Sequence, residues 1–275
     1  MVGAALKAAF ERTESEVVGL AAKSSYMSDE LKGFRRLSRM SFYAGVSPVW
    51  LMAHGERAAI SMLTTLIKPK IVIEIGTRFG GSAFLFSETA ERVICIDIDS
   101  AVRDRTAGVS NIEVTIGDSA DEIPKILSDL RRNGDDFDLA LIDGDHSAAG
   151  VRADIEAFIA SRPTRPCWLI LHDTFNPTVR EGIRSVDWDK PWVSQVEIDF
   201  VPGDLKKDPA IFRQMWGGIG VVELQPTDRS EPLIVNEASG LLYEAALGRS
   251  SHAANAVNQM RRIARHIKRR LNSFA

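Results

Sequence analysis

The spacing of hydrophobic residues along the chain changes near residue 70. Over residues 1–65, apolar side chains recur at roughly helical intervals among Lys, Glu and Arg. Pro48 interrupts the pattern, which resumes over residues 50–66. This spacing predicts helices, and we expect residues 1–65 to form an N-terminal helical cap region.

From residue 71 onward, short β-branched runs alternate with helical stretches. We expect parallel strands at 71–75 (IVIEI), 93–98 (VICIDI), 112–116 (IEVTI), 137–143 (FDLALID) and 167–173 (CWLILHD). The periodic segments between them predict helices at 82–92, 120–130 and 151–159. Near-continuous apolar strands that alternate with helices are typical of a parallel sheet covered on both faces.

Two later strand-like runs complete the predicted sheet. We expect QVEIDFV at 195–201 and GGIGVVEL at 217–224 to pair as an antiparallel hairpin at one sheet edge. The predicted fold class is α/β, a doubly wound, Rossmann-like, mostly parallel seven-stranded sheet with added N-terminal helices. Residues 66–225 would form this domain.

The C-terminal segment indicates what kind of surface it contacts. We expect residues 226–275 to form a helical tail, in which 257–271 is basic and amphipathic. Such a helix packs on its own domain or on a second subunit more often than on a membrane or nucleic acid. A homo-oligomer through the N-terminal helices or the tail stays open.

Charge, hydropathy and cysteine content exclude several classes of protein. The 275 residues include 34 Lys and Arg and 37 Asp and Glu, so we expect no global attraction to nucleic acid. A transmembrane helix needs about 20 consecutive apolar residues, and no apolar run in this sequence approaches that length. Both cysteines lie in apolar runs, which disfavours disulfides and a thiolate zinc site. We therefore expect a soluble cytoplasmic protein.

In open α/β sheets, ligands bind at the carboxyl ends of the strands. The first strand ends in Glu74-Ile75-Gly76-Thr77-Arg78-Phe79-Gly80-Gly81-Ser82, where glycines permit a tight turn before a helix. A phosphate-binding loop would need Lys after its last glycine, and the dinucleotide fingerprint G-x-G-x-x-G is absent. These absences favour a ligand with one carboxylate and one ammonium group, with Glu74 as the partner of the cation.

The second and third strand ends favour an adenosine ligand. Asp97 follows Gly76 by 21 residues, a spacing at which an acidic side chain meets a ribose diol. Taken alone, Asp97 could equally be a solvated carboxylate at a strand end. The third strand ends in Gly117-Asp118-Ser119, which offers polar groups to the edge of an adenine.

The fourth and fifth strand ends are acidic. One is Asp143-Gly144-Asp145-His146 and the other is His172-Asp173-Thr174. Because adjacent parallel strands lie about 4.8 Å apart, Asp143 and Asp173 can converge, with His172 or Asp145 beside them. Paired carboxylates favour Mg²⁺ or Mn²⁺, and a site that recruits His172 would also admit Fe²⁺ or Zn²⁺. Alternatively, Asp173 caps a turn and His172 points into the sheet.

Together these strand ends resemble the class I S-adenosylmethionine-dependent methyltransferases. The resemblance is closest to the metal-dependent O-methyltransferases, such as catechol O-methyltransferase and the enzymes that methylate antibiotic sugars. It covers about residues 50–225 and rests on EIGTRFGGSA (74–83), CIDID (95–99), GDSAD (117–121), IDGDHS (142–147), LHDT (171–174) and MWGGIGVVE (215–223).

The resemblance implies roles for individual residues. It implies that S-adenosylmethionine is bound by Glu74, Gly76, Thr77, Gly80, Ser82, Asp97, Asp118 and Ser119. It implies that a divalent metal, Mg or Mn, is held by Asp143, His172 and Asp173, and that His146 is the general base. This chain departs from the family at His172, where Asp or Glu is usual, and at 162–166, which replaces a glycine pair.

The expected activity is methyl transfer from S-adenosylmethionine to the hydroxyl oxygen of a small molecule, assisted by the metal. Two alternatives use the same sheet. An NAD-dependent oxidoreductase would explain Asp97 but not the carboxylates at 143 and 173. A non-catalytic nucleoside-binding regulatory module would bind the ligand without turnover.

Overall fold

The computed structural model describes residues 50–252. The helices expected before residue 50 and the basic segment 257–271 lie outside the described residues. None of the described helices has the length and apolar character needed to cross a membrane.

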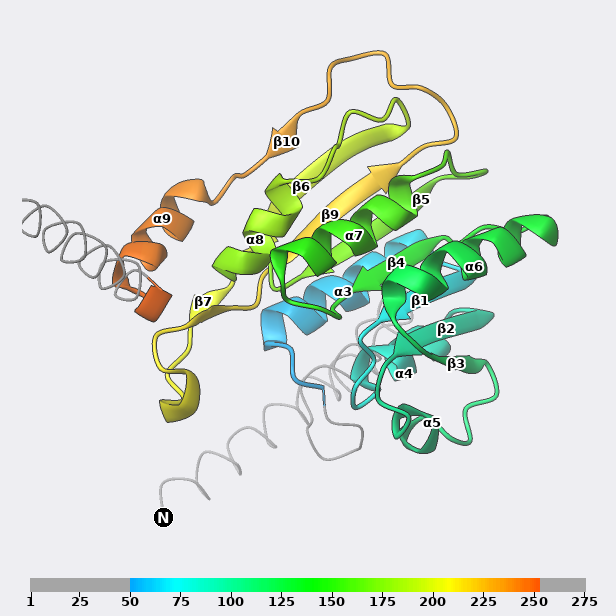
Figure 1. The fold of residues 1–275 in the computed structure, drawn as a ribbon, viewed down its shortest axis with the longest axis horizontal. Coiled ribbons are helices and arrows are strands. Elements are labelled where there is room, and N and C mark those ends of the chain that lie inside the picture. The colour runs from blue at the N-terminus through cyan, green and yellow to red at the C-terminus, as the bar shows by residue number, and fades with distance from the viewer. Residues whose placement is uncertain (1–49, 253–275) are drawn as a thin grey trace, which may run out of the picture. The chain divides into compact units, whose positions relative to one another are not determined.

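A single large sheet forms the centre of the described chain (Figure 1). Its strands are β1 (Ile71–Ile75), β2 (Arg92–Asp97), β3 (Ile112–Ile116), β4 (Leu139–Ile142), β5 (Cys167–His172), β6 (Val193–Val201), β9 (Ile219–Leu224) and β10 (Val235–Asn236). They are arranged in the order β10-β6-β9-β5-β4-β1-β2-β3. β9 runs antiparallel to its neighbours β5 and β6, whereas every other neighbouring pair is parallel.

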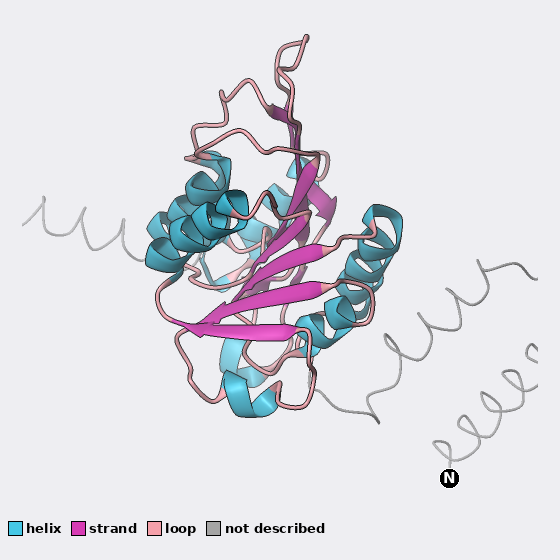
Figure 2. Ribbon diagram, turned by 90° about the vertical axis from the view of Figure 1, so that its right-hand side faces the viewer, coloured by secondary structure: helices cyan, strands magenta, loops and turns pink. Residues whose placement is uncertain are grey.

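Helices cover both faces of the sheet (Figure 2). They are α3 (His54–Ile67), α4 (Gly81–Ser87), α5 (Val102–Arg105), α6 (Ser119–Arg132), α7 (Ala148–Ile159), α8 (Pro177–Arg184) and α9 (Gly240–Arg249). α6, α7 and α8 contact one another in sequence and pack on the sheet. The main core lies beneath them, where Ile71, Ile73 and Ile75 of β1 meet apolar residues of these three helices.

The α/β class and the mostly parallel sheet are confirmed, and β1 and β3 have the expected bounds. β6 and β9 pair antiparallel as expected, but not as a hairpin at the sheet edge. β9 lies between β5 and β6, and the short strand β10 adds an eighth strand outside β6. The central position suits β9 because most of its side chains are buried on both faces.

Polar caps start the helices directly after the strand ends that form the ligand-binding edge. Asp118, Ser147 and Asn176 precede α6, α7 and α8 and accept hydrogen bonds from backbone N–H groups two or three residues further on. Pro177 then occupies the first position of α8, where a missing N–H costs nothing. The connections after β3, β4 and β5 are therefore short and fixed.

A buried ion network ties the segment after β5 to the end of the described chain. The guanidinium of Arg180 on α8 binds both carboxylate oxygens of Asp199 on β6, at 2.8 and 2.9 Å, and both side chains are fully buried. The same guanidinium contacts Glu237 at 2.8 Å and lies 4.2 Å from the ring centroid of Tyr243 on α9. α8, β6 and α9 are thereby held in one arrangement.

We predict that Arg180→Leu lowers the free energy of unfolding by about 3–5 kcal/mol, because Asp199 would remain buried without a cation. Urea unfolding followed by circular dichroism measures the change. The double variant Arg180→Leu/Asp199→Asn should recover part of the loss. If the free energy of unfolding of Arg180→Leu lies within about 1 kcal/mol of the wild-type value, the buried ion network does not stabilise the fold in this way.

Candidate active site

The carboxyl ends of β1 to β5 open into one cleft of about 1150 Å³. Its floor is formed by the turns that follow β1, β2, β3 and β4. Its opposite wall comes from residues 50–56 and from the segment that contains β7 (Asp204–Leu205) and β8 (Met215–Trp216), a separate two-stranded sheet. The strand ends that the sequence singled out therefore meet in one place.

The turn after β1 is packed against the end of β4. Gly76 has a φ of 82°, and a Cβ at this position would lie 2.1 Å from the carbonyl oxygen of Asp143. Gly80, with a φ of 84°, precedes the first residue of α4. Both glycines adopt backbone conformations that other residues rarely take, and at Gly76 no larger residue fits. The turn and the acidic end of β4 are in backbone contact.

Glu74 lies beneath this turn and has no exposed surface. Its carboxyl accepts hydrogen bonds from the hydroxyl of Ser82 and from Cys95 Sγ, the latter at 3.5 Å. Burial raises the pKa of Glu74 to about 7, against the opposing effect of the hydrogen bond from Ser82. The residues that line the cleft include Gly76, Thr77 and Ser82 but not Glu74. Glu74 thus holds the turn through Ser82, and its expected role as the partner of a ligand's cation stays a prediction.

Asp97 stands at the end of β2 and lines the cleft. Its Oδ2 accepts the N–H of Arg78 and its Oδ1 accepts the N–H of Asp99, both at 2.8 Å. These bonds orient the carboxylate and leave further lone pairs on each oxygen for a ligand. Ile98, which follows it, is 81% exposed and also lines the cleft. Ile98 could not be predicted as a cleft residue from the sequence, because a single exposed apolar residue belongs to no motif.

The end of β3 combines a helix cap with a second acidic residue. Asp118 caps α6 by accepting the N–H of Ala120 at 2.9 Å. The hydroxyl of Ser119 donates to Oδ1 of Asp154 on α7 at 2.6 Å, and all three side chains line the cleft. Asp154 was not predicted, since it lies inside a helical run with no strand end beside it. Burial, followed by the nearby charges of Asp118 and Asp145, raises its pKa to about 6.

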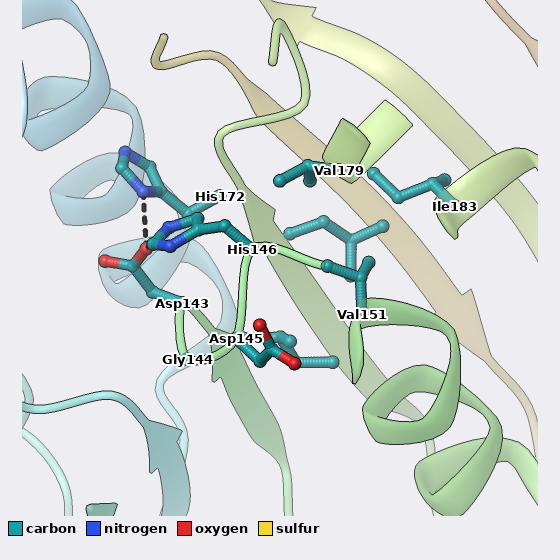
Figure 3. Close-up of a pocket in the computed structure, with 10 residues that line it drawn as sticks. Asp143, Gly144, Asp145, His146, Val151, His172, Val179 and Ile183 are labelled. Atoms are coloured by element: carbon teal, nitrogen blue, oxygen red, sulfur yellow. Dashed lines mark hydrogen bonds and ion pairs between the residues drawn. The ribbon is translucent and has the colours of Figure 1, made fainter. Parts of the chain in front are cut away.

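Asp143 and Asp173 meet as predicted, and both histidines lie beside them. Figure 3 shows Asp143 with His146 and His172. Nδ1 of His172 is 2.8 Å from Oδ1 of Asp143 and 3.6 Å from Oδ2 of Asp173. Nε2 of His146 is 2.9 Å from Oδ2 of Asp173 and 3.6 Å from Oδ1 of Asp143. Asp145 instead points away, and Ser147 donates two hydrogen bonds to it.

A third carboxylate, that of Glu56, completes this cluster. Glu56 is in the first turn of α3, and its side chain is only 4% exposed. Its Oε2 lies 3.6 Å from Nε2 of His172, and its Oε1 accepts the N–H of Gly218 at 2.7 Å. The sequence analysis missed Glu56 because it lies before the first strand, far along the chain from the other acidic residues.

The two imidazoles and the carboxylates stabilise each other's charged forms. Burial is the largest single effect on Asp143 and raises its pKa, but the charges and hydrogen bonds of His172 and His146 together outweigh burial and lower the pKa. In turn, the charge of Asp143 raises the pKa of His172 well above its ordinary value in spite of burial. Hydrogen bonds to Asp143 and Asp173 raise the pKa of His146 to about 9. Both shifts favour the protonated form of the histidines beside these carboxylates.

Asp173 adopts a strained backbone conformation that directs its carboxylate into the cluster. Its φ is 57°, in the left-handed region that residues other than glycine rarely enter. Its Oδ1 accepts the N–H of Gly217 at 2.5 Å, a bond that holds the side chain against the wall of the cleft. The alternative that Asp173 only caps a turn does not describe this geometry.

The candidate metal ligands differ in one residue from those expected. Ligand atoms of Asp143, His146 and Asp173 lie within 4.8 Å of one another. His172, predicted as a ligand, instead has its two ring nitrogens directed at Asp143 and Glu56. His146, predicted as a base, supplies the imidazole of the group. The position of a histidine in the sequence near a strand end does not determine whether His146 or His172 turns its ring toward the candidate metal ligands Asp143 and Asp173.

Comparisons with known proteins agree with this architecture. Residues 73–174 match the family model described as a methyltransferase domain. A curated relative, the rhamnosyl O-methyltransferase of Mycobacterium leprae, is 27% identical over 97 residues, which cover 33% of this chain and 42% of the relative. The aligned segment thus spans less than half of that protein.

Two solved structures are also similar in fold. The O-methyltransferase TomG of Streptomyces achromogenes, solved with S-adenosylmethionine, is 12% identical with a TM-score of 0.47, and the match covers 77% of this chain and 96% of that one. An O-methyltransferase of Bacillus cereus, solved with S-adenosylhomocysteine, is 17% identical with a TM-score of 0.45, covering 75% and 96%.

The residues that match the methyltransferase model, 73–174, contain the turn after β1 and the acidic ends of β4 and β5. The chain resembles the class I, S-adenosylmethionine-dependent O-methyltransferases, as the strand ends suggested. The family match does not favour an NAD-dependent oxidoreductase.

We predict that stability depends on pH through Glu74. Because its pKa is raised to about 7 in the folded state, its contribution is complete below the unfolded-state value of 4.5 and is lost as pH rises to about 7. Glu74→Gln should abolish this loss, which we expect to be about 3 kcal/mol. Urea unfolding between pH 5 and 8 measures it.

The control for this experiment is Glu91→Gln, which changes a carboxyl whose side chain is 69% exposed on the loop before β2. It should keep the slope of the wild type. If Glu74→Gln also keeps that slope, the carboxyl of Glu74 does not titrate in the folded protein as its burial requires.

Proposed function

We propose that the chain transfers a methyl group from S-adenosylmethionine to a hydroxyl oxygen of a small molecule, with help from a divalent cation. The observation that carries the proposal is the contact between two sites. Gly76 in the turn after β1 lies against the backbone of Asp143, so a cofactor on this turn would be next to the acidic cluster. A methyl donor and an activated hydroxyl would then share one cleft.

The cofactor would lie along the ends of β1, β2 and β3. The turn that contains Gly76, Thr77, Gly80 and Ser82 would bind its amino-acid portion, with Glu74 as the support of Ser82. Asp97 would bind the ribose hydroxyls, and Asp118 and Ser119 would lie at the adenine. We propose residues 66–225 as the domain that binds the cofactor, and Glu56 as a contribution from the preceding helix.

The donor set fits a divalent cation. Two carboxylates and one imidazole, from Asp143, Asp173 and His146, have ligand atoms within 4.8 Å of one another, and oxygen-rich sets of this kind suit Mg²⁺ or Mn²⁺. When bound, the cation would lower the pKa of an acceptor hydroxyl and favour the neutral form of His146. His172 would hold Asp143 in position through its bond at 2.8 Å.

The chain's own residues would align the acceptor and remove its proton. His146 is half-exposed at the cleft, and its ring is 5.4 Å from that of Trp216, measured between centroids. Where Asp143 and Asp173 alone hold the cation, neutral His146 has a free ring nitrogen that can accept the hydroxyl proton, whereas an imidazole bound to the cation has none. Trp216 offers the acceptor an apolar wall. Since the methyl group of the cofactor is already activated, alignment of donor and acceptor supplies most of the acceleration.

We predict that the protein binds S-adenosylhomocysteine in titration calorimetry and that Asp97→Asn weakens this binding about 10- to 100-fold, the effect of losing hydrogen bonds to a charged group. Asp104→Asn, on the exposed face of α5, is the control and should bind like the wild type. Binding of NAD in place of S-adenosylhomocysteine would refute the cofactor assignment.

We predict that Mn²⁺ binds the protein and that Asp173→Asn lowers its affinity at least about 10-fold, because one carboxylate ligand loses its charge. Titration calorimetry with Mn²⁺ measures this without an acceptor. Asp145→Asn is the matched control, since its carboxylate points away from the cluster. Binding of S-adenosylhomocysteine should persist in EDTA.

Two results would separate the remaining alternatives. Equal Mn²⁺ binding by the wild type and Asp173→Asn would remove the metal site from the proposal. Binding of S-adenosylhomocysteine and Mn²⁺ without methyl transfer to any of a panel of phenols, sugars and other alcohols would favour the nucleoside-binding regulatory module.

A further inference from the structure

Asp154 of α7 is an acidic residue in the cleft to which the proposed function gives no role. It is 1% exposed, yet it lines the cleft. One carboxylate oxygen, Oδ1, accepts the hydroxyl hydrogen bond of Ser119 at 2.6 Å. The other, Oδ2, is buried and has no hydrogen-bond partner among the described residues.

An unpaired buried carboxylate oxygen is rare and costly, because its lost hydration is not replaced. Oδ2 lies on the side of the carboxyl that faces the turn after β4, since a Cβ on Gly144 would be 3.7 Å from it. Residue 144 is a glycine, so no side chain at that position covers Oδ2, and Asp154 is among the residues that line the cleft. A ligand that offers a hydrogen-bond donor at this point would satisfy the oxygen.

The position of Asp154 selects one donor of the cofactor. S-adenosylmethionine carries three kinds of donor: the ammonium group, the ribose hydroxyls and the exocyclic amino group of adenine. The proposed function places the ammonium group at the end of β1 and the ribose hydroxyls at the end of β2. Asp154 is bonded to Ser119 at the end of β3, the strand end proposed to lie at the adenine. The exocyclic amino group is the donor on that part of the ligand.

We propose that Asp154 is a specificity-determining residue that accepts a hydrogen bond from the exocyclic amino group of adenine through Oδ2, while Ser119 orients its carboxyl through Oδ1. The inference rests on the proposed function, because it takes S-adenosylmethionine as the ligand. The inference adds that the binding site prefers a 6-amino purine to a 6-oxo purine. A 6-oxo purine would direct a carbonyl oxygen at the carboxylate and be repelled, whereas a 6-amino purine donates to it.

The charges around Asp154 agree with this assignment. Burial and the acidic neighbours Asp118 and Asp145 raise the pKa of Asp154 to about 6. No cationic side chain among the described residues forms an ion pair with it within 4.0 Å. A neutral amino group therefore suits the site, since it satisfies Oδ2 without bringing a further negative charge.

The test compares three ligands by titration calorimetry with the full chain. These are S-adenosylhomocysteine, its 6-desamino analogue with hydrogen at C6 of the purine, and S-inosylhomocysteine with oxygen at C6. The wild type should bind S-adenosylhomocysteine about 10- to 100-fold more tightly than the 6-desamino analogue, the range for a hydrogen bond to a charged acceptor. S-inosylhomocysteine should bind most weakly.

Asp154→Ala should remove this preference, so that the first two ligands bind with dissociation constants within about threefold of each other. Because a buried alanine could disturb packing, Asp154→Asn is the second variant; it keeps the volume and should lower the preference at least about fivefold, since it lacks the charge. Asp104→Asn, on the exposed face of α5 and outside the cleft lining, is the control, and its preference should stay as in the wild type.

The failures of the two proposals are distinguishable. If the wild type does not bind S-adenosylhomocysteine, the proposed function fails, and the assignment of Asp154 fails with it. If the wild type binds but both Asp154 variants keep the preference for the amino group, Asp154 does not recognise adenine and the proposed function stands. A variant that weakens all three ligands equally would likewise overturn the assignment, because that result indicates a structural role.

Discussion

Three carboxylates and two imidazoles share one small volume at the carboxyl ends of β4 and β5, and the surrounding structure depends on their balance of charge. Glu56, Asp143 and Asp173 would repel each other strongly in this poorly solvated position if nothing positive lay between them. His172 lies between Asp143 and Glu56, and His146 lies against Asp173. The cluster therefore joins α3 to the sheet, although α3 comes before β1 in the chain.

The same cluster fixes the wall of the cleft. Glu56 and Asp173 accept hydrogen bonds from the consecutive N–H groups of Gly218 and Gly217, which connect β8 to β9. Both glycines have positive φ, so the chain can turn sharply there. The antiparallel strand β9 then enters the sheet beside β5, and its start is fixed by the carboxylates that the proposed reaction uses. Fold and site are coupled at this point.

The sequence predicted the sheet because buried parallel strands are apolar on both faces. IVIEI and IEVTI are bounded by polar turns, and the structure gives β1 and β3 the expected limits. The polar residues at the strand ends also fell where expected, since the carboxyl ends of parallel strands share one edge. The period of the hydrophobic residues and the position of a polar residue at a strand end are enough to predict such features.

Side-chain direction was harder to predict than position. Glu74 alternates with Ile73 and Ile75, so it faces the side of the sheet occupied by α4 and bonds to Ser82 within the interior. The exchange between His146 and His172 has a similar cause, because rotamers depend on neighbours such as Glu56 that the local sequence does not contain. Asp154 resembles any acid on a helix until Ser119 and Gly144 are brought beside it.

The two sides of the cleft differ in how far the sequence determines them. The side proposed for the cofactor consists of strand ends, whose places follow from hydrophobic runs. The opposite side combines Leu51 with Lys206 and Trp216, each of which follows Leu51 by more than 150 residues. Its path is set by packing of Met215 and Phe175 against Tyr243 of α9, and no local pattern specifies such contacts. Since the acceptor would lie against this wall, its identity depends on tertiary contacts, whereas the strand ends indicate an adenosine ligand and carry the resemblance that implies S-adenosylmethionine.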